Sequence, residues 1–583
     1  MEYQVSFGTL GRKPASAGKP GAKFRLAVLG DFSGRANAGK LETGSALAER
    51  KPIKVDVDNL DDVIARMKLS LSLPLGEDGA VAVPIGSMDD FHPDQIVENV
   101  ELFSSLLELR KNLSSRAGFD RAAREVLSWG GEEPLPPPPR RSRAATVATD
   151  RKLSDFARLI GHPAAAAPSV AERSVDEWMR RLVGPYIEPK RDARQDALMA
   201  RVDEALSATM RRILHHPDFQ TAESLWRGVE LLARHIETDA RTEIVLYDIS
   251  AEELAADLAA SDALENSGFY GLLVEKPVLD AHQGAISAVV GLYGFELVPP
   301  HADLLGRAAQ IAAAAGAPFI AAISPDPLKT KFHDQHPLIQ DAWSALYALP
   351  AAAYLGLATP RFLLRMPYGR NTDPIDAFAF EEFTRQSGLS GMLWAHPGIL
   401  AGYLLAETWV KQGAKMKLGS VMNLGDMPYY VYTDEDGEQI ALPCTERLYS
   451  ERQAVQVASY RVMPVLSLRG RPEVRLGGFT SLAGTPLAGF WGPAQATPAA
   501  PSDTPAAPQA PEAAPPEEVS AQPASADEPA AAPEPAAAEP AAASDDAATN
   551  ELDALLASLN AEPPPAAPDA TEADLDALLA SLK

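Results

Sequence analysis

The sequence predicts an α/β (mixed α+β) fold. Two α/β domains are joined by a proline-rich linker and a helical segment, and a disordered acidic tail follows. Three observations predict it. Short apolar runs typical of buried strands alternate with amphipathic helical periods in two regions, 23–115 and 240–490. A run of four prolines, Pro136–Pro139, separates these regions. Between residues 493 and 550 large apolar residues are almost absent.

We therefore divide the chain into five parts. They are an N-terminal strand and linker (1–22), a first α/β domain (23–115), a linker that includes the proline run (116–173), a larger second domain that begins with helices (174–492) and the tail (493–583). In the first part, Tyr3, Val5 and Phe7 alternate with polar residues. This periodicity fits an ordinary first strand and equally a segment that pairs with a sheet edge in its own or another chain.

Strand and helix patterns alternate in the first domain. Phe24–Leu29 is a nearly continuous apolar run, typical of a strand that is covered on both faces. Residues 53–57 alternate between apolar and charged side chains, which indicates a half-buried strand. Helices are expected after Asn59, a favoured N-cap residue type, and from Pro93 to Leu113, since proline suits the first turn.

The second domain is expected to contain a partly parallel sheet. A helical region ends before Pro217, and Asp218 is expected to cap the next helix, whose apolar face includes Trp226. Ser250 begins a capping-box pattern. A strand–helix–strand pattern then runs from residue 286 to Ile323, with Gly316 closing the helix. Such a unit requires two parallel strands.

Composition and charge restrict the class of protein. The 583-residue chain has a net charge of −26, and 17 acidic residues against one basic residue place −16 of it after residue 492. No basic region offers the counterion release that nucleic-acid binding requires, so nucleic acid is not an expected partner. The single cysteine, Cys444, the lack of a signal peptide and the lack of a membrane-spanning run predict a cytoplasmic protein without membrane insertion.

Candidate chemical motifs are few and weak. Adjacent histidines His215 and His216 point about 100° apart on a helix, and His333 and His336 lack further ligands, so no metal site is expected. The loop Gly30–Arg35 follows a strand but lacks the Gly-Lys-Ser/Thr ending of a phosphate-binding loop. A structural turn is the expected reading of this loop.

Two further positions were considered for chemistry. Cys444 has no evident histidine partner, so nucleophilic catalysis has no support. Arg365 lies in a strand-and-turn pattern, and the alternative is a buried arginine that orders a polar network with Glu381 or Glu382. We expect no catalytic residue, no cofactor and no metal, and the chain is not expected to be an enzyme.

The tail contains one clear repeat. A nine-residue leucine pattern at 551–559 recurs at 574–582, and in each copy the leucines fall at i, i+3, i+4 and i+7. Segments this short are not stable helices alone. They are either chance islands in the tail or docking helices that fold in the groove of a partner, and their near-exact repetition favours docking. The predicted binding residues are Leu552, Leu555, Leu556, Leu559, Leu575, Leu578, Leu579 and Leu582.

The first domain resembles the small subunit of the type VI secretion contractile sheath. The resemblance lies in Phe24–Arg35, Val55–Asp61 and Asp90–Gln95, which occur in the family's order and spacing. The second domain resembles the large subunit more strongly. The matching segments are Leu214–Gln220 with Glu223 and Trp226–Gly228, Asp303–Leu305, Ala317–Ala322, Leu355–Leu357, Pro360–Gly369, Phe380–Glu382, Leu393–Trp394, Thr445–Glu446 and Glu451–Gln453.

The resemblance implies a mechanical function. In the family, small and large subunits interlock by β-strand exchange into a tubular sheath, and contraction drives an inner tube outward. An AAA+ ATPase then recycles the contracted sheath by engaging an N-terminal segment of the large subunit. In this chain the resemblance implies that this docking segment lies between residues 150 and 190. The resemblance thus implies two sheath-type α/β domains, with sheath subunits, inner tube, baseplate and ATPase as partners.

Two departures from the family pattern keep alternatives open. The two subunits are usually separate chains, and the resemblance ends near Gly492, before the large subunit's further C-terminal domain. A sheath-like adaptor or baseplate-associated protein that recruits a partner through the leucine repeats is the alternative. A more distant one is an enzyme that uses the Asp31 or His216 region.

Overall fold

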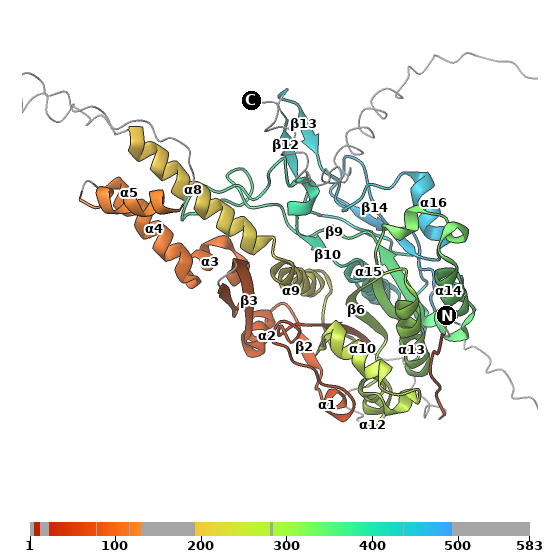
Figure 1. The fold of residues 1–583 in the computed structure, drawn as a ribbon. Helices are drawn as coiled ribbons and strands as arrows, with labels where there is room; N and C mark the ends of the chain where they lie inside the picture. The colour runs from red at the N-terminus through yellow and green to blue at the C-terminus, as the bar shows by residue number, and fades with distance from the viewer. Residues whose placement is uncertain are drawn as a thin grey trace, which may run out of the picture. The chain divides into compact units, whose positions relative to one another are not determined.

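Nine strands form the central sheet of the computed structural model, which describes residues 5–11, 23–76, 79–115, 117–129, 193–279, 284–434 and 436–492. The strands are β1 (Phe24–Gly30), β2 (Ile53–Val55), β5 (Thr242–Asp248), β6 (Ala288–Phe295), β7 (Phe319–Ile323), β8 (Leu355–Thr359), β11 (Asn423–Leu424), β14 (Met463–Ser467) and β15 (Val474–Leu476). Their spatial order is β11-β15-β14-β8-β7-β6-β1-β5-β2. Figure 1 labels β2, β6 and β14 of this sheet among the surrounding helices. Residues 1–493 are one unit and 494–583 another.

The middle of this sheet is parallel and its two ends are antiparallel. The six strands from β14 to β5 run in one direction, whereas β2 at one end and β15 and β11 at the other run against their neighbours. All residues of β1, β7 and β8 are buried, as a parallel sheet with both faces covered requires. The predicted double-sided burial of Phe24–Leu29 and the parallel strand–helix–strand unit are therefore confirmed.

β1 joins the two predicted domains into one sheet. It pairs with β5 from Phe24 opposite Thr242 to Gly30 opposite Asp248, and on its other edge with β6. The two predicted α/β segments therefore share one sheet. Both long neighbours of β1 come from the second segment, whereas the two longest remaining strands of the first segment, Leu69–Gly76 and Gly79–Ile85, pair with each other.

Helices cover both faces of the sheet, and β1 contributes to both hydrophobic cores. Leu26 and Val28 face α9 (Pro217–His235) and α15 (Pro397–Gln412), in the core that also holds Trp226. Ala27 and Leu29 face the opposite core with α10 (Ala251–Ala259), α13 (Pro299–Ala315) and α14 (Pro337–Ala348). Alternate strand residues point to opposite faces, so one strand stabilises both layers.

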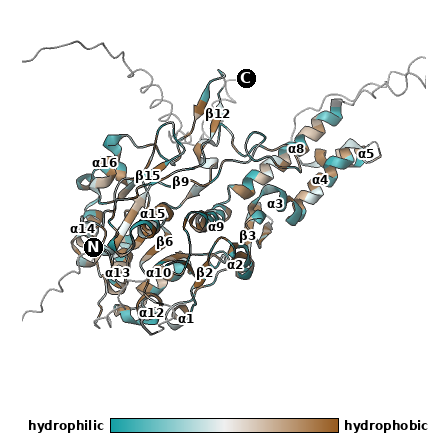
Figure 2. Ribbon diagram, turned by 180° about the vertical axis from the view of Figure 1, so that it is seen from behind, coloured by the Kyte–Doolittle hydropathy of each residue, from teal (hydrophilic) through white to brown (hydrophobic). Residues whose placement is uncertain are grey.

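A group of helices is also built from both segments. It consists of α4 (Glu101–Ser114), α5 (Phe119–Ser128) and α8 (Ala193–Leu214), and hydropathy alternates along α8 and α4 (Figure 2). Arg110 on α4 pairs with Asp203 on α8 at 2.6 Å, and Gln195 donates to the Leu113 carbonyl at 2.8 Å. The predicted helix from Pro93 is interrupted at Val100, which separates α3 (Pro93–Asn99) from α4.

The remaining elements are short. Three two-stranded sheets pair β3 (Leu69–Gly76) with β4 (Gly79–Ile85), β9 (Phe362–Leu363) with β10 (Trp394–Ala395), and β12 (Val431–Thr433) with β13 (Gln439–Ala441). The helices not yet given are α1 (Ser45–Ala48), α2 (Leu60–Met67), α11 (Gly268–Tyr270), α12 (Lys276–Leu279) and α16 (Glu451–Ser459). β3 and β4 form an antiparallel hairpin.

Among the described residues, histidine–proline pairs begin four helices. His92, His216, His336 and His396 each precede a proline, and each Nδ1 accepts a hydrogen bond from the backbone N–H two residues later, at 3.1–3.2 Å. The prediction that Asp218 caps α9 is therefore wrong, because the cap is His216. Asn59 also fails to cap α2, since its side chain accepts from Asp56 N–H instead.

Candidate functional site

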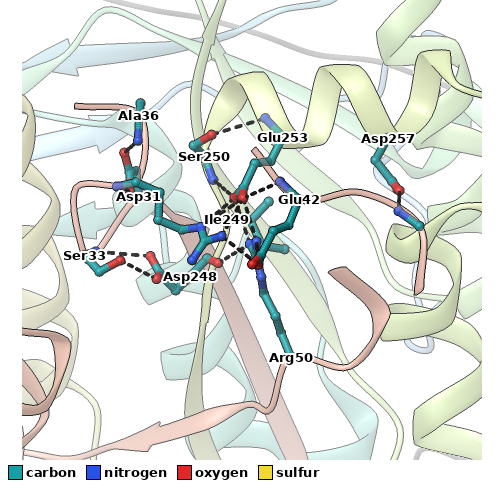
Figure 3. Close-up of polar contacts among 12 residues, drawn as sticks. Asp31, Ser33, Ala36, Glu42, Arg50, Asp248, Ile249, Ser250, Glu253 and Asp257 are labelled. Carbon is teal, nitrogen blue, oxygen red and sulfur yellow. Dashed lines mark hydrogen bonds and ion pairs between the residues drawn. The ribbon is translucent and has the colours of Figure 1, made fainter. Parts of the chain in front are cut away.

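The most extensive polar contacts in the described residues lie where the first segment (23–129) meets the second segment (193–492); we call this boundary the seam. Glu253 is at its centre, fully buried at the start of α10, where it also completes the predicted capping box with Ser250. Arg35 and Arg50 reach Glu253 from the first segment at 2.6–3.0 Å. Glu42, half exposed, pairs with both arginines at 2.7 and 2.9 Å (Figure 3).

The Glu253 cluster stabilises the seam by neutralising its own charges. Two carboxylates face two guanidinium groups, so no net charge is left in the buried space. Burial opposes ionisation of Glu253, but hydrogen bonds from Arg50 and Arg35 outweigh it and lower the pKa of Glu253 to about 2. The carboxylate therefore stays ionised and paired at all physiological pH values.

The loop after β1 is held by carboxylates rather than by a phosphate. Asp31 accepts hydrogen bonds from the backbone N–H groups of Arg35 and Ala36, and the Ser33 hydroxyl donates to Asp248 at 2.7 Å (Figure 3). Burial raises the pKa of Asp31, and the two N–H bonds oppose that rise. The expected structural turn at Gly30–Arg35 is confirmed.

A second ion cluster lies on the sheet itself. Glu243 on β5 pairs with Lys23, with Arg25 on β1 at 2.9 Å and with Lys54 on β2 at 2.8 Å. Burial opposes its ionisation, yet the hydrogen bonds from Lys23, Lys54 and Arg25 lower the pKa of Glu243 to about 2. One acid of the second segment thus joins three bases of the first.

A third cluster, around Arg365, lies beside the seam. Arg365 pairs with Glu223 on α9 at 2.7 Å and with Glu382 at 2.7 Å, and both acids are almost fully buried. Burial opposes ionisation of Glu382, but the charge of Arg365 and the hydrogen bonds from Arg365 and from Tyr368 N–H prevail and lower the pKa of Glu382 to about 2. The hypothesis that Arg365 orders a network with Glu382 is confirmed. Glu381 is not its partner and instead accepts from Arg370 N–H.

Tyr368 connects the Arg365 cluster to the first segment. The Arg365 guanidinium lies 4.1 Å from the centre of the Tyr368 ring, and Arg227 donates to the Tyr368 hydroxyl at 3.0 Å. On its other side Tyr368 meets the His92 ring edge-on at 5.0 Å. Nearby, Asp94 accepts from two backbone N–H groups of the second segment, at Asp376 and Ala377.

Comparison with known proteins assigns the two segments. Residues 20–123 match the type VI secretion system VipA family, and residues 196–483 match VipB, described as a tail sheath N-terminal domain. The type VI secretion system sheath protein TssC1 of Pseudomonas aeruginosa is 30% identical over 341 residues, which cover 54% of this chain and 68% of TssC1. The chain belongs to the type VI secretion sheath protein family.

A second sheath protein of the same organism matches the first segment. TssB1 is 33% identical over 98 residues, which cover 16% of this chain and 55% of TssB1. This chain is therefore a fusion of a small-subunit-like and a large-subunit-like sheath part, and the seam lies between them within one sheath protein. Both families are structural sheath families, and their other members indicate assembly with sheath subunits.

Two of the four histidines at the candidate metal positions, His216 and His336, cap helices of this sheath protein. The His215 Nε2 lies 3.7 Å from Glu382, and His333 is exposed beside Asp334. Within the described ranges, no three His, Cys, Asp or Glu side chains gather so as to hold a metal ion. The Cys444 thiol is buried, and burial raises its pKa, so the reactive thiolate is disfavoured.

A cavity of about 240 Å³ lies beside the loop after β1, lined among others by Asp31, Asp218, Leu225 and Tyr293. The enzyme alternative would place its chemistry here. However, both Asp31 oxygens accept backbone N–H bonds, and the Tyr293 hydroxyl donates to the Ile249 carbonyl at 2.9 Å. These polar groups are engaged in holding the fold.

The eight leucines predicted to bind a partner, from Leu552 to Leu582, lie outside the described residues, as do the proline run and the segment 150–190. No helix in the part of the chain that the structure describes has the length and hydropathy of a bilayer span. Sequence reasoning missed Glu253, Arg35 and Arg50 as the central seam cluster. The capping box did mark Glu253, but its arginine partners are more than 200 residues away.

Proposed function

We propose that this fused chain assembles by β-strand exchange, with copies of itself or other sheath subunits, into a cytoplasmic contractile sheath that drives effector delivery. The observation that carries the proposal is the pair of sheet edges at which no further strand lies among the described residues. β2 and β11 end the nine-stranded sheet and are three and two residues long. Unpaired edge N–H and C=O groups are the usual template for adding a strand from another chain.

Two exposed apolar residues support the proposal. Val57, two residues after β2, is 57% exposed, and Val431 on the separate β12–β13 hairpin is 41% exposed. Each strand of that hairpin has one unpaired edge among the described residues. Short edges of this kind resist indiscriminate aggregation while leaving a place for one matched strand.

Val57→Lys tests the β2 edge. We expect at least a tenfold loss of the high-mass species in sedimentation velocity when the variant is co-expressed with its neighbouring gene products. Val455→Lys replaces a comparably exposed valine (66%) that lies on helix α16 and not at a strand end, so it is the matched control and should assemble normally. Wild-type protein that stays monomeric and does not associate with other sheath components would refute the proposal.

The remaining partners follow from the sheath role. The inner tube and the baseplate would contact the assembled sheath, and an AAA+ ATPase would recycle it through residues 150–190. On this proposal the chain is not an enzyme and needs no cofactor, because the energy is stored in subunit contacts. A peptide of residues 150–190 that retains no ATPase in a pull-down would exclude that docking segment.

An adaptor role is the second candidate, favoured by the repeated leucine pattern of the tail. Two copies would raise avidity for one partner through effective concentration. Deleting residues 493–583 separates the two functions. A sheath subunit should still assemble after the deletion, whereas an adaptor should lose its partner with its folded body intact.

A further inference from the structure

The cavity of about 240 Å³ beside the loop after β1 lies where the order of the parallel strands reverses. β5 is added on one side of β1, and β6, β7 and β8 are then added in turn on the other side. The walls of the cavity include Asp31, directly after β1, and Tyr293, close to the end of β6. Open α/β sheets bind ligands outside the carboxyl ends of their strands at such a reversal. The cavity therefore occupies the position in which this kind of sheet holds a ligand.

The size of the cavity restricts the ligand to a small organic group. Pockets for cofactors and drug-sized molecules measure roughly 300–1,000 Å³, so a nucleotide is too large for this one. A cavity of roughly 150 Å³ already holds benzene, so a group of about six non-hydrogen atoms fits. The apolar part of the wall is formed mainly by three leucines, Leu71, Leu225 and Leu292. An aliphatic chain in the cavity would contact this apolar surface.

The polar part of the wall carries unpaired negative charge. It includes Asp31, Asp218 and Glu252, whereas no Lys, Arg or His is among the lining residues in the described part of the chain. Asp31 accepts backbone N–H bonds, and Asp218 accepts from Asn37 Nδ2 at 2.9 Å, so both have neutral partners. The Glu252 side chain makes no hydrogen bond or ion pair within the described ranges. By contrast, the buried acid Glu253 of the seam is paired with two arginines.

The electrostatics around Asp31 favour a cation in this space. Burial raises the pKa of Asp31, its backbone hydrogen bonds oppose the rise, and the charges of Asp248 and Glu252 increase it. A bound cation would stabilise the charged form of the carboxylates around it. A metal ion does not fit, because no three His, Cys, Asp or Glu side chains among the described residues gather to hold one. A cation on an aliphatic stem matches both the acidic and the apolar wall.

We propose that this cavity, the switch-point cavity, binds a primary alkylammonium group, with the ammonium at the carboxylates and the alkyl stem along the leucines. An ammonium has three N–H donors and no acceptor, so carboxylate oxygens satisfy it. Two sources supply this chemistry, a free alkylamine and the lysine side chain of another protein chain. The site does not rest on the proposed sheath assembly, because binding of a free alkylamine needs only one folded chain.

Saturation-transfer NMR titration of the full-length chain with n-butylammonium chloride tests the site. 1-Butanol has a similar stem without the charge, so it should bind about tenfold more weakly for want of charge-assisted hydrogen bonds. Asp218→Asn combined with Glu252→Gln removes two of the carboxylates and should weaken n-butylammonium binding about fivefold. Glu451→Gln is the matched control. It also removes an exposed first-turn carboxylate from a helix with a capping box, α16, and should leave binding unchanged.

A titration with Nα-acetyl-lysine N-methylamide distinguishes the two sources. Binding at least as tight as that of n-butylammonium assigns the cavity to a lysine side chain of another chain. Weaker binding than that of n-butylammonium assigns it to a free alkylamine. Both results support an alkylammonium site, since each requires that n-butylammonium is bound.

Two results would overturn the proposal. One is no saturation transfer to n-butylammonium with the wild-type chain. The other is a dissociation constant for n-butylammonium that equals that of 1-butanol or that is the same in the wild type and the double variant. Circular dichroism establishes that each variant is folded. If the double variant unfolds, Glu252→Gln alone replaces it and should weaken binding about twofold, since this side chain has no partner to lose among the described residues.

Discussion

Glu253→Gln tests whether the seam makes the two segments one folding unit. The substitution preserves the shape of the side chain and an oxygen that can accept from Ser250 N–H, so it removes charge without removing the cap. Arg35 and Arg50, whose side chains are 12% and 13% exposed, would keep only Glu42 as a counterion. Breaking a buried ion pair from one side costs roughly 3–5 kcal/mol. We expect the lower end, about 3 kcal/mol, because Glu42 remains.

Urea denaturation followed by circular dichroism measures this free energy of unfolding. The wild type and the variant should each unfold in a single transition, since both segments share the sheet and the seam. Glu42→Gln is the matched control. Its carboxylate is half exposed, so its loss should cost no more than about 1 kcal/mol. A cost below about 1 kcal/mol for Glu253→Gln, or two separate transitions in the wild type, would refute this reasoning.

Three further changes probe the core and the buried charges. Trp226→Ala should cost about 3–5 kcal/mol in the same assay, because the ring is fully buried and its Nε1 donates to the Phe32 carbonyl; a change near zero would contradict this. Burial lowers the pKa of His396 to about 4, so the contribution of this neutral side chain to stability should be complete above pH 6.5 and lost as the pH falls towards 4. His396→Asn can still cap α15, and it should flatten the plot of unfolding free energy against pH in this range. The carboxyls of Glu253 and Glu382 have pKa values of about 2, so they contribute stability above pH 4.5 that should be lost between pH 4.5 and 2. A free energy of unfolding that does not change over that range would contradict their pairing.

Local patterns in the sequence predicted elements well where local physics decides. The continuous apolar run of β1, the capping box at Ser250 and the glycine that closes α13 all have reasons within a few residues. The four His-Pro caps were equally readable, since each histidine precedes a proline at a helix start. They were missed because histidine is not among the usual capping residues.

Long-range partners could not be predicted in the same way. β1 pairs with β5 and β6, which lie more than 200 residues away. The residues of β1 themselves do not indicate that both neighbouring strands belong to the second segment. The same limit applies to Arg35 and Arg50, whose shared partner Glu253 is set by the sheet and not by spacing. Residues 5–11 show a related limit. Their alternating pattern suits a strand, but they form only one β-bridge, and their carbonyls accept hydrogen bonds from Arg307 and Gln310 on α13.

Electron cryomicroscopy of the fused chain, purified with its neighbouring gene products, tests both the sheath role and the shared sheet directly. We expect helical tubes in which each subunit shows β1 between β5 and β6 of the same chain, with a strand of a neighbouring subunit added at an open edge. Isolated particles with no added strand, or tubes in which β1 is inserted into the sheet of a different chain, would contradict it.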